Sequence, residues 1–254
     1  MKQNFIALAT CMCLINPLFG QWVKTVFPCD CTIQDVHVRG DDVFAFGVGA
    51  GLKRSSDQGQ TWEDAMTGIT SFLVLKITSN SQHLFAATYN GIFRSSNNGD
   101  TWEQLTTGIN TGIFWSVAAH GEVLVACADN KRVYFSINNG DSWAQSPILL
   151  PSSSTGSVFD VILQDYNTWI VSGAENIALT TDAGASWTEY ETGAGFDLMS
   201  VISYDDTLYV GSTGDGIFKS GDLATTWTPE TSYPAEASCN SNITDLLAVG
   251  NRVF

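Results

Sequence analysis

Three aspartates stand where they could do chemistry together. Asp35, Asp160 and Asp245 each precede a short apolar run of strand length, and they hold roughly equivalent places at the starts of those runs. Carboxylates gathered at one mouth could bind a cation, or two of them could supply the general acid and base of a glycoside hydrolase. The plainer interpretation is that each aspartate caps a strand at a repeated turn.

Aromatic residues near these aspartates, or at matching places in other parts of the chain, suggest a binding surface. An indole or phenyl ring can stack on a sugar ring, or it can pack between neighbouring sheets of the protein. The candidates for ligand contact are Phe114, Trp115, Phe159 and Phe196, with Met199 nearby. All of them lie close to the loops that lead into predicted inner strands.

The elements that must position these residues come from an internal repeat. Five copies of an eight-residue box end in a tryptophan, and the intervals between these tryptophans are 40, 41, 44 and 40 residues. Each repeat contains short apolar runs of strand length and no helical periodicity, for example 84–87, 91–94 and 113–117. Four strands in about 40 residues are typical of a propeller blade. We therefore predict an all-β fold, a β-propeller of five full four-stranded blades plus parts of at least one more.

The box itself is predicted to be a turn between the third and fourth strands. Asp or Asn at its third position accepts amide hydrogen bonds, Gly at the fifth supplies a left-handed backbone, and Ser or Thr ties the ends. The tryptophan then packs between sheets while its indole N–H seeks a carbonyl. The predicted structural residues are Asp57, Gly59, Trp62, Asn97, Gly99, Trp102, Asn138, Gly140, Trp143, Asp182, Gly184, Trp187, Asp222 and Trp227.

The pattern S/T-x-D-x-G-x-S/T-W resembles the Asp-box, or bacterial neuraminidase repeat. This box occurs in sialidases, sortilin-like receptors, xyloglucan-cleaving hydrolases and photosystem assembly-factor-like propellers. The resemblance covers nearly the whole chain after residue 21, and the boxes at 55–62 and 180–187 match fully. Asn97 and Asn138 replace the aspartate and Ala224 replaces the glycine, so we expect the fifth box to be the least regular. The resemblance implies that the box is structural and lies away from any active site.

The two ends of the chain predict a propeller that continues beyond it. Residues 22–26 begin with Trp22, which stands 40 residues before Trp62, and are expected to form a lone outer strand that completes the last blade. Residues 243–254 begin another repeat and stop within a strand. We expect a propeller domain over 22–254, incomplete at its C-terminus, as part of a longer multidomain surface protein.

The first 21 residues are typical of a secretory signal peptide, because Lys2 is followed by an apolar run from Phe5 to Phe19. This predicts a secreted protein, extracellular or periplasmic. The net charge of −15 argues against nucleic acid or an anionic membrane as partner, since both require clustered Lys and Arg. No later segment reaches the ~18 apolar residues of an integral membrane span.

The sequence predicts no cofactor, and it identifies no metal site. The histidines are scattered, at His37, His83 and His120. Cys29 and Cys31 have no second ligand pair at zinc spacing. Cys239 could pair with one of them across the seam of the propeller, although a local bridge or free thiols fit equally well. Cys127 lies on an apolar run and is expected to be a buried free thiol.

Two functions follow from these residues. The first is a non-catalytic propeller that binds a protein or a glycan through the loops before the inner strands, and this is the function we expect. The second is a fragment of a carbohydrate-active hydrolase, xyloglucanase-like or sialidase-like. A sialidase needs three convergent arginines, whereas Arg54, Arg94 and Lys219 recur at one place in the repeat, which is typical of a structural role.

Overall fold

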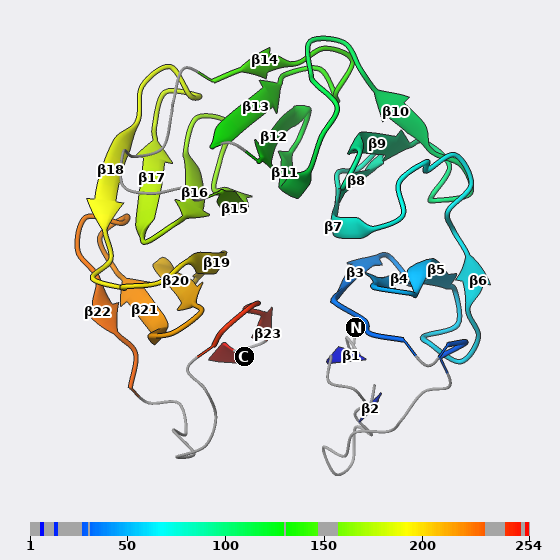
Figure 1. The fold of residues 1–254 in the computed structure, drawn as a ribbon, viewed down its shortest axis with the longest axis horizontal. Helices are drawn as coiled ribbons and strands as arrows, with labels where there is room; N and C mark the ends of the chain where they lie inside the picture. Colours follow the sequence, from blue (N-terminus) through cyan, green and yellow to red (C-terminus); the bar gives the residue numbers. More distant parts are fainter. Residues whose placement is uncertain are drawn as a thin grey trace. The chain divides into compact units, whose positions relative to one another are not determined.

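The repeat folds into five four-stranded antiparallel sheets, in which the strands pair in sequence order (Figure 1). The computed structural model describes residues 6–7, 13–14, 27–29, 31–129, 131–146, 157–231, 242–249 and 252–253. Each predicted apolar run is a strand of one of these sheets, so the prediction of an all-β propeller with four-stranded blades is confirmed. The predicted outer strand at Trp22 lies outside the described residues.

The blades have the following strands. Blade 1 contains β3 (Asp35–Arg39), β4 (Asp42–Gly47), β5 (Gly51–Ser55) and β6 (Glu63–Asp64). Blade 2 contains β7 (Val74–Ser79), β8 (Leu84–Thr88), β9 (Gly91–Ser95) and β10 (Glu103–Leu105). Blade 3 contains β11 (Phe114–His120), β12 (Val123–Ala128), β13 (Arg132–Ser136) and β14 (Ala144–Gln145).

Blade 4 contains β15 (Val158–Leu163), β16 (Trp169–Gly173), β17 (Asn176–Thr180) and β18 (Thr188–Glu191). Blade 5 contains β19 (Leu198–Tyr204), β20 (Thr207–Ser212), β21 (Gly216–Ser220) and β22 (Thr228–Pro229). Two further antiparallel pairs are β1 (Ile6–Ala7) with β2 (Cys13–Leu14) and β23 (Ala248–Val249) with β24 (Arg252–Val253). The described residues contain no helix long and apolar enough to span a bilayer.

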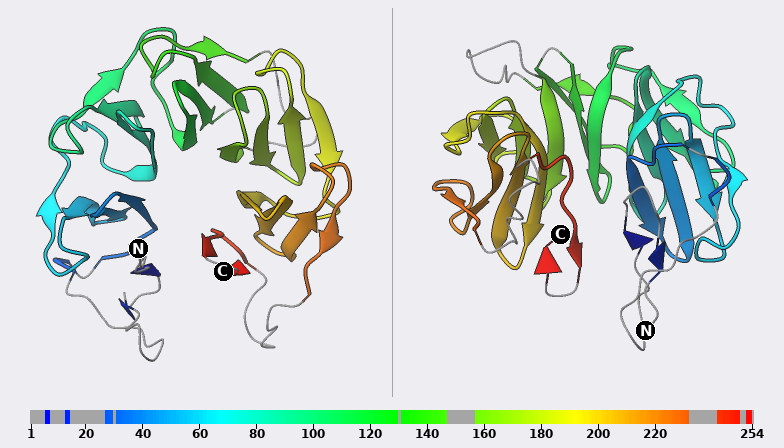
Figure 2. Two further views of the ribbon diagram at one scale, coloured as in Figure 1. Left: turned by 180° about the vertical axis from the view of Figure 1, so that it is seen from behind. Right: turned by 60° about the horizontal axis from the view of Figure 1, so that its bottom comes forward.

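The chain divides into two compact units, which we treat separately. The first unit, Met1–Leu105, holds blades 1 and 2, and the second, Thr106–Phe254, holds blades 3 to 5. Neighbouring strands of a blade are antiparallel, so successive connections lie at opposite ends of the sheet (Figure 2). We call one the loop end: it carries the loop leading into the first strand and the turn between the second and third strands. The other is the box end: it carries the turn between the first and second strands and the box between the third and fourth.

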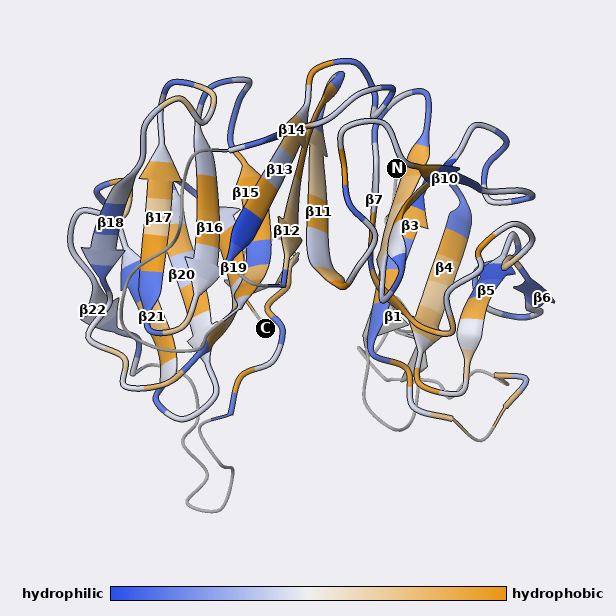
Figure 3. Cartoon of the chain, turned by 45° about the horizontal axis from the view of Figure 1, so that its top comes forward, coloured by the Kyte–Doolittle hydropathy of each residue, from blue (hydrophilic) through white to orange (hydrophobic). Residues whose placement is uncertain are grey.

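The core lies between successive sheets of each unit. In the first unit Phe44 and Phe46 of β4 pack with Leu84 and Phe93 of blade 2. In the second unit the side chains of β12 pack against β15 and β16, and those of β16 and β17 pack against β19 and β20. Hydrophobic colour accordingly dominates β17, whereas the outer strand β18 is hydrophilic (Figure 3). The second and third strands are buried where a neighbouring blade of the same unit packs against them.

The box forms the predicted turn in every blade. In the first copy Ser55 Oγ donates to Asp57 Oδ1 at 2.8 Å and accepts the Gly59 N–H at 2.7 Å. Asp57 also accepts the Thr61 N–H at 2.8 Å and the Thr61 hydroxyl at 2.6 Å. These side-chain hydrogen bonds hold the pKa of Asp57 down at about 2. Where asparagine replaces aspartate, at Asn97, the amide nitrogen donates to Thr101 Oγ1 instead, and the turn is unchanged.

The fifth box is not less regular, which corrects the expectation from Ala224. Ala224 donates its N–H to Ser220 Oγ at 3.0 Å and takes a φ of +68°. The methyl group meets no indole there, since Leu208 holds the place that Trp169 holds in blade 4, where a Cβ on Gly184 would lie 2.7 Å from the ring. The fourth box position is also left-handed in all five copies, a feature that the sequence pattern did not predict.

Two box tryptophans, Trp102 and Trp187, bond to the blade before their own. Trp102 is buried, donates its indole N–H to Ala65 O at 2.9 Å and donates its backbone N–H to Thr67 O at 2.9 Å. A Cβ on Gly68 would lie 2.1 Å from Trp102 O, so only glycine allows this approach. Trp187 donates instead to Ser146 Oγ of blade 3. The predicted packing of tryptophan between sheets is therefore observed in both units.

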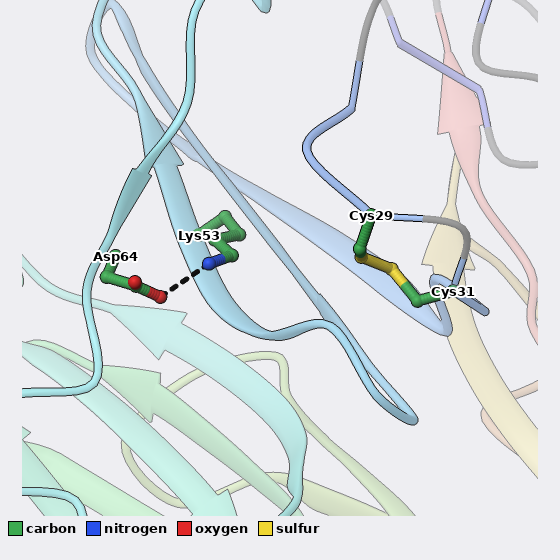
Figure 4. The surroundings of a disulfide bond; sticks show 4 residues. All are labelled: Cys29, Cys31, Lys53 and Asp64. Atoms are coloured by element: carbon green, nitrogen blue, oxygen red, sulfur yellow. Dashed lines mark hydrogen bonds and ion pairs between the residues drawn. A yellow bond between two sulfur atoms is a disulfide. The ribbon is translucent and has the colours of Figure 1, made fainter.

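Cys29 and Cys31 form a disulfide with each other (Figure 4). This is the local bridge, and Cys239, the alternative partner, lies outside the described residues. Lys53 and Asp64, at the loop-end side of blade 1, form an ion pair at 2.5 Å. Cys127 is buried with a free thiol, as predicted, and burial raises the pKa of that thiol.

Candidate functional site

The three candidate carboxylates hold equivalent positions in their repeats. The residues at this position are Asp35, Lys76, Ser116, Asp160, Ser200 and Asp245, and we call them the inner column. For the first five, the register with the second strand of the same blade shows that the positions are equivalent. The pairs are Asp35 with Phe46, Lys76 with Ala87, Ser116 with Cys127, Asp160 with Ser172, and Ser200 with Gly211. Asp245 joins the column through its contact with Ser200. In blades 2 to 5 a β-bulge precedes the column residue.

Asp160 ties three successive blades together. Its side chain is buried, and Oδ1 accepts the Ser116 hydroxyl of blade 3 at 2.7 Å and the Val161 N–H at 2.9 Å. Its Oδ2 accepts the Val201 N–H of blade 5 at 3.0 Å. Both carboxylate oxygens are thus used by the protein itself. A buried carboxylate with three donors is typical of a satisfied structural group.

Asp35 and Asp245 resemble Asp160 in the contacts of their carboxylates. Asp35 Oδ1 accepts the Val36 N–H at 2.6 Å, and its Oδ2 pairs with Lys76 Nζ at 3.0 Å. Asp245 Oδ1 accepts the Leu246 N–H at 2.9 Å and the Ser200 hydroxyl at 3.3 Å. Each carboxylate accepts the N–H of the residue that follows it and contacts the neighbouring inner strand. For Asp35, which begins β3, this is the bonding of a strand cap, the plainer interpretation.

The arrangement limits what chemistry the carboxylates can do. Asp160 and Asp245 lie on either side of β19, bonded to its adjacent residues Val201 and Ser200, while Asp35 belongs to the other unit. Within the described part of the chain, no three His, Cys, Asp or Glu side chains are grouped so that they could hold a metal ion. A general acid or base must be able to exchange a proton with a substrate, and Asp160 faces only protein donors.

The aromatic candidates separate into different environments. Phe114 is fully buried, with its ring 5.7 Å from that of Tyr134, so it packs within the protein and offers no surface to a ligand. Trp115 and Phe159 are the bulge residues of β11 and β15, half-buried, with ring centroids 5.8 Å apart. Phe196 is 54% exposed in the loop before β19. Two candidates therefore pack edge to face on neighbouring inner strands, and one stands in solvent.

Phe72 is the exposed aromatic residue that the sequence analysis missed. It is 77% exposed, more than any other large apolar side chain among the described residues, and its ring lies 5.1 Å from that of Tyr89. Phe72 stands two residues before β7, as Phe196 stands two residues before β19. Aligning the loops as well as the boxes would have found the pair, because the spacing to the first strand is the same.

The histidines hold no common site. His37 Nε2 lies 2.9 Å from Ser79 Oγ, between β3 and β7. Burial, helped by the charges of Lys76 and Arg39 and opposed by Asp35, lowers the pKa of His37 to about 4. His120 packs edge to face against Tyr166 at 4.8 Å, and His83 lies 5.9 Å from Phe85.

Comparison with solved structures finds propellers at low sequence identity. YCF48 from Cyanidioschyzon merolae is 15% identical with a TM-score of 0.68, and the match covers 89% of this chain and 80% of that one. YCF48 bound to D1 peptide is 17% identical with a TM-score of 0.53, covering 64% and 54%. An ancestral GH74 enzyme is 16% identical with a TM-score of 0.62, covering 77% of this chain and 30% of that one. At these identities the likeness concerns the fold alone.

Comparison by sequence gives the family. A search of curated proteins found no match. The profile of the DUF6242 beta propeller domain matches residues 30–168, more than half of the chain, from the loop before blade 1 into blade 4. The chain belongs to the DUF6242 beta propeller domain family.

Proposed function

We propose that the chain is a secreted or cell-surface β-propeller of the Asp-box class that binds a protein or a glycan and catalyses no reaction. The observation that carries this proposal is the bonding of Asp160. Its two oxygens accept hydrogen bonds from Ser116, Val161 and Val201, so the best-placed candidate acid or base is engaged in holding blades together.

The other parts of the proposal have their own support. Assignment to the Asp-box class is supported by the five turns, which share one hydrogen-bond pattern from box position one to seven. Secretion is supported by the apolar leader over residues 1–21. Binding is supported by the exposed aromatic ring of Phe72 at a loop end. The fold is also that of YCF48, which is described as bound to D1 peptide.

A glycoside hydrolase fragment is the second candidate. It is favoured by the position of Asp160 and Asp245 on the two sides of β19, and by the shared fold with a GH74 enzyme, of which this chain spans 30%. It is opposed by the contacts that both carboxylates already make. Inverting and retaining hydrolases both need one carboxyl group that is free to protonate the leaving oxygen.

Hydrolysis assays distinguish the two functions. The full chain is incubated with xyloglucan, a mixed-linkage β-glucan and a sialylated glycan, and new reducing ends and free sialic acid are measured. We expect no release above a protein-free control. Release that disappears in Asp245→Asn, with the far-ultraviolet circular dichroism spectrum unchanged, would contradict the non-catalytic proposal and establish the hydrolase.

A further inference from the structure

Phe72 and Tyr89 form an exposed aromatic platform at the loop end of blade 2. Phe72 lies in the loop before β7 and Tyr89 in the turn between β8 and β9, and their ring planes are tilted by 52°. Hydrogen bonds to the Leu73 carbonyl order both segments: the Tyr89 N–H donates to Leu73 O at 3.3 Å, and the Ser71 hydroxyl donates to the same oxygen at 3.2 Å. The ring of Phe72 is therefore presented by an ordered loop, although 77% of the residue is in solvent.

The described loop-end segments of the first unit contain no charged residue. The described residues of the loop-end segments in the first unit are 27–29, 31–34, 48–50, 65–73 and 89–90, and none of them is Asp, Glu, Lys or Arg. Charges at the adjoining strand ends are paired with one another, Lys53 with Asp64 and Lys76 with Asp35. Polar groups are present as hydroxyls and amides, with Thr70 and Asn90 exposed beside the platform.

These features identify the chemistry of a ligand. A charged ligand would find no counter-charge here and would lose hydration without compensation. A protein partner needs about 800 Å² of contact on each side, with an apolar core. The exposed large apolar residues that the described loop-end segments of the first unit offer are Val48 and Phe72. A neutral sugar ring needs less: its C–H face packs on one aromatic face, and its hydroxyls bond to nearby hydroxyls and amides.

Phe196 provides a matched comparison within the same chain. It holds the equivalent loop position in blade 5, packs over Gly214 and is 54% exposed. Its surroundings are acidic, because Asp197 follows it and Asp215 accepts the Gly195 N–H at 2.6 Å. The two phenylalanines thus share their place in the repeat and differ in the charge around them.

We infer that the Phe72–Tyr89 platform is a binding site for a neutral saccharide. The inference rests on the proposed binding function and deepens it by naming the ligand class and the residues. It assigns stacking to the Phe72 ring, with Tyr89 as its support and Thr70 and Asn90 as hydrogen-bonding neighbours.

Affinity electrophoresis of the full chain tests this site. The gels contain neutral β-glucans, mannans or galactans, with anionic polygalacturonate and cationic chitosan as charged controls. We expect retardation by at least one neutral polysaccharide, weakened about tenfold or more in Phe72→Ala, the effect of losing one stacked ring. Phe72→Trp keeps an aromatic face and should retain binding, and Phe196→Ala should bind like the wild type.

Several results would overturn the inference that this platform binds a neutral saccharide. No retardation by any neutral member would contradict the ligand class, as would stronger retention by polygalacturonate or chitosan. Equal loss in Phe72→Ala and Phe196→Ala would contradict the site. Binding of a purified protein through Phe72, with no saccharide retained, would leave the non-catalytic proposal standing and overturn this inference. Hydrolysis of the polysaccharide by the wild type would instead contradict the proposed function.

Discussion

The two units use one repeat but distribute charge very differently. Met1–Leu105 contains 7 Lys and Arg against 9 Asp and Glu, whereas Thr106–Phe254 contains 4 against 17. In the first unit Arg54 pairs with Glu63 and Asp100, each at 2.7 Å. The equivalent places before the third and fourth boxes hold Phe135 and Leu179. Because the box hydrogen bonds are the same in both units, the comparison teaches that the turn needs no ion pair.

The two units also differ in the charged residues of their loop ends and of the inner column. The described loop-end segments of the first unit are uncharged, while those of the second include Asp129, Lys131, Glu175, Asp197 and Asp215. The inner column of the first unit is joined by an ion pair, Asp35 with Lys76, whereas that of the second is joined by hydrogen bonds to the buried Asp160. The second unit should therefore respond most to loss of one buried carboxylate.

The largest expected effect is from Asp160→Ala. The substitution leaves the Val201 N–H and the Ser116 hydroxyl buried without an acceptor, so we expect a loss of about 3 kcal/mol in the free energy of unfolding. The matched substitution Asp35→Ala removes a partly exposed ion pair and should cost about 1 kcal/mol. Urea denaturation of both variants measures the difference. Equal losses would show that the two units do not differ in this way.

The next effect is a pH dependence that arises at His37 in the first unit. The unfolded chain protonates His37 near pH 6.5, whereas the folded chain does so only near pH 4. The unfolded state therefore binds more protons in this window, and stability falls as the pH drops from 6.5 to 4, by about 1.4 kcal/mol per pH unit. Unfolding measured at pH 7.5, 5.5 and 4.5 should show this loss in the wild type. His37→Gln should remove that contribution, and an unchanged pH profile in the variant would contradict it.

Exchanging the fifth box position between blades 4 and 5 should act in opposite directions. Gly184→Ala places a methyl group against the Trp169 indole and strains the backbone at φ +82°, so we expect a loss of about 2 kcal/mol. Ala224→Gly relieves the strain at φ +68° and should stabilise by about 0.5 kcal/mol. Thermal melts of the two variants test the pair. Destabilisation by Ala224→Gly would show that the buried methyl group matters more than the backbone.

A small destabilisation is expected from loss of the Arg54 ion pairs in the first unit. Arg54→Met removes the contacts to Glu63 and Asp100 but keeps most of the apolar stem. We expect a loss of about 1 kcal/mol at low salt that shrinks in 1 M NaCl, because exposed ion pairs are screened. Unfolding curves at the two salt concentrations measure this. A loss that does not depend on salt would assign the role of Arg54 to packing and to its 2.6 Å hydrogen bond with Asn98 O.

The fold was largely predictable from the repeat. Trp102 and its relatives fixed the period, and the apolar runs between them located the second and third strands to within two residues. Local chemistry determines these features, because the box satisfies its own hydrogen bonds within eight residues. The regular fifth box was not predicted, since Leu208 and Ala224 adapt to each other across two strands, and that match is not visible in the box pattern.

The site was less predictable because its residues are defined by contacts between blades. The shared register of Asp35 and Asp160 was visible in the sequence, but their partners Lys76, Ser116 and Val201 come from neighbouring repeats. Phe114 and Phe72 show the same limit. One is buried and the other exposed, although both lie near the start of a first strand. Burial at such positions depends on how the loop packs, which composition does not reveal.

A double-mutant cycle on Ser116 and Asp160 tests most directly whether the inner column holds blades together. The free energy of unfolding is measured for the wild type, Ser116→Ala, Asp160→Ala and the double variant. The account predicts a coupling of about 1 kcal/mol or more, because each single change already breaks the 2.7 Å hydrogen bond between blades 3 and 4. Additive losses, with no coupling between the two residues, would contradict it and return Asp160 to the groups available for chemistry.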